Sequence, residues 1–169
     1  MGQRKQGKRW GELSGGREAK LYTLENDKGY KLTLSDLGAT IVEFLVPTAS
    51  GDVLDVVLGY DTPAEYEAQD GYLGAVVGRV GNRLGTGGFR LDDKVYRLSR
   101  NEGDHTLHGG EVGFDKALWL VDLYEDQHIT FRHVSKDGDQ GFPGEVIATV
   151  SYTLTDEGQV ELLYQATAD

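Results

Sequence analysis

The chain has 169 residues, a length that suits a single domain with a sizeable buried core. Its 24 glycines and nine tyrosines favour a turn-rich β protein over a helical one. The formal net charge of −11 would repel polyanions and anionic lipids. We therefore expect no nucleic-acid or membrane partner, whereas a neutral small molecule is compatible with that field.

Further absences narrow the class of protein. The chain has no cysteine, which excludes disulfides and thiolate metal sites. No apolar run approaches the roughly 18 residues that cross a bilayer, and the N-terminus lacks the apolar segment of a signal peptide. Cytoplasmic residence is the resulting expectation.

Residues 1–9 have no apolar side chain after Met1 and include four basic ones, so they cannot bury enough surface to offset the entropy of ordering. We expect a disordered basic tail there; the alternative is an arm that binds a polyanion. No repeat, linker or change of composition divides the rest. Residues 10–169 are therefore predicted to form one domain.

Alternation of apolar and polar side chains, and more continuous apolar runs over residues 40–46 and 53–58, predict strands at the start of this domain. Tyr30, Leu32 and Leu34 alternate with polar neighbours, which is the period-2 pattern of a half-buried strand. The expected strands are residues 20–24, 30–35, 40–46 and 53–58.

One short helix is predicted after these strands, over residues 62–68. Thr62 can cap it, Pro63 suits its first position, and Glu65 completes a capping box. Strands and turns then alternate again, which favours an all-β, antiparallel sandwich with at most this one helix. The later strands are expected at residues 89–91, 95–98, 118–124, 128–134, 146–154 and 160–166.

Residues 78–119 are dense in glycine and carry Asn, Arg and His side chains. Glycine permits sharp turns and close backbone approach, while these side chains present fixed hydrogen bonds to a polar ligand. The stretch is therefore a predicted binding surface. Its ordered motifs are Gly78-Arg79-Val80-Gly81-Asn82-Arg83, Leu91-Asp92-Asp93-Lys94-Val95-Tyr96-Arg97-Leu98, Leu107-His108-Gly109-Gly110 and Gly113-Phe114-Asp115.

This order of motifs resembles the aldose 1-epimerases, also called galactose mutarotases, and several ordered motifs are more specific than any single one. The resemblance implies a large β-sandwich with a sugar groove across one sheet. It implies an isomerase that interconverts the α and β anomers of a hexose such as galactose or glucose, without a cofactor. It also implies that Asn82, Arg83 and His108 bind the substrate and that His108 supports catalysis.

The residue types suit that chemistry. Opening a hemiacetal ring needs one group that takes the anomeric hydroxyl proton and another that protonates the ring oxygen, and the imidazole of His108 can do either. Arg83 and Asn82 offer donors and an acceptor to vicinal hydroxyls. The alternatives are a turn histidine bonded to its own backbone, a turn role for Asn82, and an ion pair between Arg83 and an acidic residue.

The other histidines are weaker candidates. His105 lies near His108 but outside the motif, and the surrounding carboxylates have no recognised ligand spacing, so no metal is expected. His128 and His133 fall in a predicted hairpin, where exposed strand positions are the expectation.

Phosphate binding is a minor alternative, because related hexose-6-phosphate epimerases need cations and the central stretch has four arginines. On an acidic chain, however, arginines are usually solvated or ion-paired. Phe114 and Trp119 are expected in the core, and the alternative is that they stack on a sugar face. The arginines concerned are Arg79, Arg90, Arg97 and Arg100.

The resemblance covers residues 10–169, about the first half of a usual family member. Members continue with a histidine that acts as general acid and, later, a glutamate that acts as general base, and neither has a counterpart here. We expect the isolated chain to be inactive or nearly so, and its sheets to be completed by self-association or by further C-terminal residues. The alternatives are a non-catalytic carbohydrate-binding module and a structural piece that binds a partner.

Overall fold

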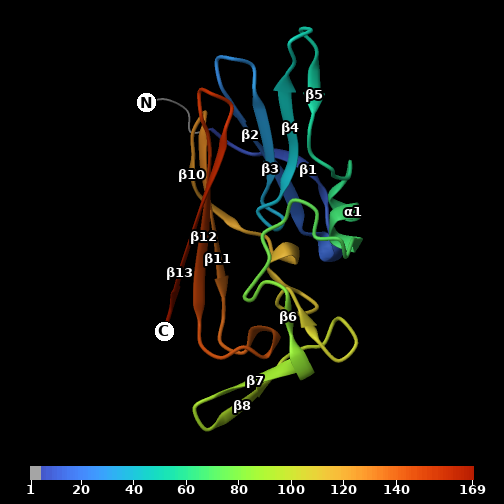
Figure 1. Ribbon diagram of the computed structural model, residues 1–169, viewed down its shortest axis with the longest axis vertical. Helices are drawn as coiled ribbons and strands as arrows, with labels where there is room; N and C mark the ends of the chain where they lie inside the picture. Colours follow the sequence, from blue (N-terminus) through green and yellow to red (C-terminus); the bar gives the residue numbers. More distant parts are fainter. Residues whose placement is uncertain (1–4) are drawn as a thin grey trace.

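The computed structural model describes residues 5–169, which form mainly antiparallel β-structure in two sheets (Figure 1). The first sheet has five strands in chain order, so each strand pairs with the one before it. These strands are β1 (Lys8–Glu12), β2 (Glu18–Glu25), β3 (Lys31–Ser35), β4 (Ile41–Pro47) and β5 (Val53–Asp55). Asn26 fixes the β2–β3 turn by accepting the amide hydrogens of Lys28 and Tyr30.

The second sheet has four strands, again in chain order. These are β10 (Leu120–Tyr124), β11 (His128–Ser135), β12 (Val146–Leu154) and β13 (Val160–Ala168). The register is continuous across the last three, with Phe131 opposite Val150 and Val150 opposite Tyr164. Side chains of one parity along these strands therefore share one face of the sheet.

The part of the chain between β5 and β10 forms two short two-stranded ladders and one α-helix. Strand β6 (Arg83–Leu84) pairs with β9 (Thr106–Leu107), β7 (Gly88–Leu91) pairs with β8 (Lys94–Arg97), and α1 spans Pro63–Ala68. The predicted capping box is confirmed: Thr62 Oγ1 accepts from the Glu65 amide, and the Glu65 carboxylate accepts from the Thr62 amide. Single 3-10 turns lie at Ser14–Gly16, Gly85–Gly87, Phe114–Lys116 and Asp139–Gly141.

The core lies between the two sheets. Leu24 and Leu32 from the first sheet and Phe131 from the second are completely buried in one cluster. Burial of each such side chain contributes roughly 1.5–3 kcal/mol relative to its exposed state. The Tyr152 hydroxyl of β12 also donates a hydrogen bond of 2.7 Å to the carbonyl of Ala39. The predicted antiparallel β-sandwich is confirmed.

The disordered tail expected over residues 1–9 was predicted to extend too far along the chain. Strand β1 begins at Lys8, within residues 1–9, and Arg9 lies opposite Lys20 of β2. The Arg9 guanidinium bonds to Glu18 at 2.5 Å, so a strand partner and an ion pair hold this basic residue in β1. Residues 1–4 of the expected tail lie outside the described residues.

The strand predicted over residues 53–58 is also shorter than expected, since β5 ends at Asp55. The Asp55 carboxylate accepts from the amide of Val57 at 3.1 Å and from that of Phe44 at 3.0 Å. A side-chain acceptor two residues before the amide makes a local turn that competes with the ladder. Continuous apolar sequence therefore overpredicted the strand.

The outer strands β5 and β13 leave apolar side chains in solvent. Leu163 and Tyr164 of β13 are each 58% exposed, and Leu58, just beyond β5, is 79% exposed. Apolar side chains on an outer strand favour association with a further strand or chain. No helix within residues 5–169 is long and apolar enough to span a membrane.

Candidate functional site

The three predicted site residues lie together at the short β6–β9 ladder. Asn82 immediately precedes β6, Arg83 begins it, and His108 immediately follows β9. Arg83 lies directly opposite Leu107 in the register. Residues 26 positions apart in the chain are thus neighbours in space, as the predicted binding surface requires.

Two hydrogen bonds connect Asn82 and His108. The His108 amide donates to the Asn82 carbonyl at 3.1 Å, and the Asn82 amide donates to His108 Nδ1 at 3.0 Å. Because Nδ1 accepts, the neutral imidazole carries its proton on Nε2. His108 is therefore set to present an Nε2–H donor to a ligand, and its ring does not bond to its own backbone amide.

His108 lies in a tight turn over Leu107–Gly110, closed by a hydrogen bond of 3.1 Å from the Gly110 amide to the Leu107 carbonyl. Its two central residues both have positive φ, 50° at His108 and 95° at Gly109, which is the pattern of a type I′ turn. A Cβ at position 109 would overlap the carbonyl of Gly78. Only glycine therefore fits after the histidine.

Arg83 forms a two-pronged ion pair with Glu102, with Nε–Oε2 at 2.5 Å and Nη2–Oε1 at 2.6 Å. Its Nη1 donates to Asn82 Oδ1 at 3.2 Å. The hydrogen bond from Arg83 holds the pKa of the Glu102 carboxyl below its usual value. A guanidinium has about five N–H donors, so roughly two remain for a ligand.

The ion pair and the turn role of Asn82 were the alternatives to ligand binding. In the structure Arg83 has an acidic partner and Asn82 has a positive φ of 64°. These contacts also hold the exposed side chains of Asn82 and Arg83 beside the half-buried His108. No sequence spacing indicated that Glu102 would be the partner of Arg83.

A cavity of about 200 Å³ borders the same turn and is lined by Tyr72, Gln69 and Asp115, among others. The Tyr72 ring lies 4.5 Å from that of His108, edge to face. Within the described residues, Gln69 Oε1 and Asp115 Oδ1 are buried without a hydrogen-bond partner. Burial raises the pKa of the Asp115 carboxyl above its usual value.

The remaining histidines lie away from this cluster or outside its contacts. His133 is half-buried, with its ring 4.9 Å from Phe114 and 5.4 Å from Trp119. Desolvation lowers its pKa, so the expectation of an exposed strand position is wrong for His133. His128 is also half-buried, and its Nδ1 lies 2.8 Å from the hydroxyl of Thr153. The core positions predicted for Phe114 and Trp119 are confirmed.

The arginines considered for phosphate mostly bond to the protein itself. Arg79 donates to Ser135 and to backbone carbonyls of the loop before β12, and burial lowers its pKa. Arg90 pairs with Asp93, and Arg100 with Asp104. No group of three or more His, Asp or Glu side chains in residues 5–169 is arranged to hold a metal ion.

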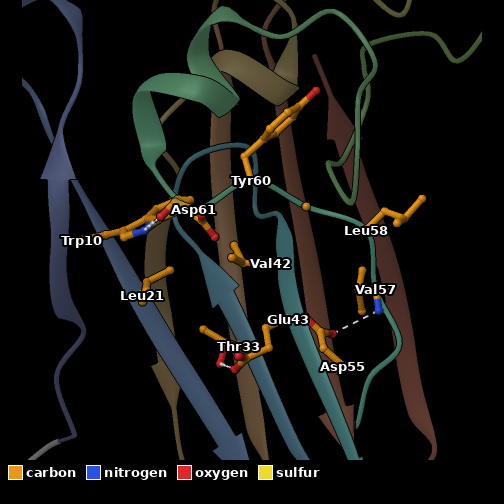
Figure 2. Close-up of a pocket in the computed structure, with 11 residues that line it drawn as sticks. Trp10, Leu21, Thr33, Val42, Glu43, Asp55, Val57, Leu58, Tyr60 and Asp61 are labelled. Atoms are coloured by element: carbon orange, nitrogen blue, oxygen red, sulfur yellow. Dashed lines mark hydrogen bonds between the residues drawn. The ribbon is translucent and has the colours of Figure 1, made fainter.

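A separate pocket of about 400 Å³ lies on the outer face of the five-stranded sheet (Figure 2). Several of its polar side chains have partners: Thr33 Oγ1 donates to Glu43 at 3.0 Å, and Trp10 Nε1 donates to the Asp61 carbonyl at 3.1 Å. Asp55 accepts two amides there, as described above. The pocket contains no predicted site residue, and no sequence motif indicated it.

Comparison with known proteins gives the same family as the motifs. The aldose 1-epimerase family model matches residues 20–169. An aldose 1-epimerase of Escherichia coli K12 is 40% identical over 154 residues, which cover 91% of this chain and 44% of that protein. A galactose mutarotase of Sus scrofa is 41% identical over 160 residues, covering 94% and 46%.

Solved structures agree. An aldose epimerase homologue from C. elegans superposes with a TM-score of 0.85 at 33% identity, covering 89% of this chain and 46% of that one. A galactose 1-epimerase from Lactobacillus acidophilus gives a TM-score of 0.79 at 25% identity, covering 97% and 49%. The chain thus spans about half the length of the relatives it matches, and it belongs to the aldose 1-epimerase family.

Proposed function

We propose that this chain is the substrate-contacting part of an aldose 1-epimerase that interconverts the anomers of a hexose such as galactose or glucose. The observation that carries the proposal is the Asn82–Arg83–His108 cluster, in which the Nε2–H of His108 and the unused guanidinium donors of Arg83 lie at the same short ladder. Family membership supports the reaction type. The family resemblance supports the roles of the three residues.

In this proposal, Asn82 and Arg83 orient the sugar through its hydroxyl groups, because an amide and a guanidinium supply several directed hydrogen bonds. The Nε2–H of His108 then donates to a sugar oxygen whose negative charge increases as the ring opens. Stabilising that developing charge supports the reaction. Ring opening still needs a base for the anomeric hydroxyl and an acid for the ring oxygen.

We further propose that the principal acid and base lie outside these 169 residues, because the family's catalytic histidine and glutamate have no matching positions here. Loss of an acid or base costs on the order of 100- to 10,000-fold in rate. Further C-terminal residues would supply them, since a second copy of this sequence lacks the same two positions. The exposed apolar side chains of β13 and of the segment after β5 are where we expect such a partner to pack.

The test combines polarimetry of fresh α-galactose and α-glucose with a galactose titration followed by NMR. We expect the chain to bind galactose saturably and to change the mutarotation rate little, if at all. His108→Ala should abolish the binding, while His128→Ala, the same change in the second sheet, should leave it intact. Acceleration that His108→Ala removes would refute the catalytic incompleteness, and an absence of saturable binding would refute the substrate-contacting role.

A non-catalytic carbohydrate-binding module is the second candidate, favoured by the lack of matched acid and base residues. Supplying the remaining residues separates the two, since only the enzyme part gains turnover. A hexose-6-phosphate epimerase-like role has less support, because Arg79, Arg90 and Arg100 bond to the protein. Tighter binding of galactose 6-phosphate than of galactose would reverse that order. The cytoplasmic location stays a prediction.

A further inference from the structure

The side chain of Asn101, which lies between β8 and β9, forms hydrogen bonds with the backbone of the turn that carries His108. Its Oδ1 accepts from the Leu107 amide at 2.7 Å, and its Nδ2 donates to the carbonyls of Leu107 at 3.0 Å and Gly110 at 3.1 Å. A carboxamide has one acceptor oxygen and two N–H donors. All of these groups are therefore engaged at the two ends of a single four-residue turn.

The turn needs such support because His108 adopts a costly backbone conformation. His108 has a side chain and yet a φ of 50°, a left-handed conformation that persists in non-glycine residues only where surrounding contacts enforce it. The turn itself supplies one hydrogen bond, from Gly110 to Leu107. Asn101 supplies three more and fixes the distance between the residues on either side of His108 and Gly109.

Tyr72 connects the same asparagine to the imidazole. Its hydroxyl lies 3.3 Å from Asn101 Nδ2, and its ring edge packs against the His108 ring with centroids 4.5 Å apart. A second contact of the imidazole is made by its Nδ1, which accepts the Asn82 amide hydrogen. The ring is thus bounded on two sides, and its Nε2–H is the group that remains for a ligand.

We infer that Asn101 is a positioning residue for His108: it holds the turn in the conformation that keeps Nδ1 on the Asn82 amide and leaves the Nε2–H free to bond a ligand. This inference deepens the proposed function and rests on it for its consequence in sugar binding. Asn101 does not touch the sugar in this account. It acts through the orientation and tautomer of the histidine.

The test compares Asn101→Ala and Asn101→Asp with a matched control, Asn26→Ala. The aspartate keeps an acceptor for the Leu107 amide but replaces the two N–H donors with an oxygen that faces two carbonyls. Asn26 also bonds to three backbone groups, donating to the Thr155 carbonyl and accepting the amides of Lys28 and Tyr30, but at the β2–β3 turn. The control therefore removes a similar set of bonds away from His108.

The first readout is the imidazole nitrogen NMR spectrum, with the His108 signals assigned by their loss in His108→Ala. We expect wild type and Asn26→Ala to show one neutral tautomer, protonated on Nε2. Both Asn101 variants should show a mixture of tautomers or a loss of the Nδ1 hydrogen bond. This readout needs no sugar. In a variant that remains folded, it detects a change in the tautomer or the hydrogen bond of His108.

The second readout is galactose affinity, which should fall on the order of 10-fold in the Asn101 variants and stay constant in Asn26→Ala, as is typical when support for a functional side chain is removed. If wild type binds no galactose, the proposed function fails while the NMR comparison still tests the positioning role. A wild-type His108 protonated on Nδ1 would overturn the inference without any variant. Folded Asn101 variants with unchanged His108 signals would also overturn it.

Discussion

Asp36 follows β3 and is buried, although it is a carboxylate. Its Oδ1 accepts from the Lys20 amide at 2.8 Å, and its Oδ2 lies 3.4 Å from the Tyr22 hydroxyl. Desolvation raises the pKa of Asp36 to about 6, and these hydrogen bonds offset the effect only in part. Asn has nearly the same shape and can keep both contacts, so Asp36→Asn removes the titration and leaves the packing.

The difference between about 6 in the folded state and the ordinary value of 3.8 corresponds to about 3 kcal/mol. The folded chain holds the proton more tightly than the unfolded chain does. The resulting stability is therefore fully present below the ordinary pKa and is lost as the pH rises through about 6. Near neutral pH the ionised wild type should be less stable than Asp36→Asn by an amount of this order.

Urea unfolding of both proteins across the range from about pH 4 to about pH 7.5 measures this difference. We expect the gap in unfolding free energy between Asp36→Asn and wild type to grow with pH and then level off. The same substitution at Asp27, an exposed position in the β2–β3 turn, should give a nearly constant gap. A constant gap for Asp36→Asn would refute the reasoning, because the carboxylate would then be solvated in the folded state.

Two further substitutions test the site turn and the contact between the sheets. Gly109→Ala should destabilise the chain by at least about 2 kcal/mol in urea unfolding and abolish galactose binding, because its Cβ would overlap the Gly78 carbonyl. Gly51→Ala has a similar positive φ but open space, so it should cost only about 1 kcal/mol, and equal costs would contradict the overlap. Tyr152→Phe should cost about 1–3 kcal/mol, since it leaves the buried Ala39 carbonyl without its donor; the exposed Tyr164→Phe should cost little, and equal losses would argue against that hydrogen bond.

The sequence alone predicted the features that depend on neighbours in the chain. Alternation at Tyr30, Leu32 and Leu34 indicated β3, because side chains of a strand face opposite sides in turn. Thr62 and Glu65 indicated the helix start, because a capping box needs residues three apart. The ordered motifs indicated the family, which the comparisons confirm.

The tertiary structure decided the contacts between residues that are distant in the chain. It paired Arg83 with Glu102 and placed the Asn82 amide within hydrogen-bond distance of His108 Nδ1. It also brought Asn101 into hydrogen bonds with both ends of the histidine turn. No periodicity encodes these contacts, since they arise only when the β6–β9 ladder forms. Residue types in order therefore predicted which groups form the candidate site, whereas long-range backbone pairing determined how each group is oriented and which of its donors stay unpaired within the described residues.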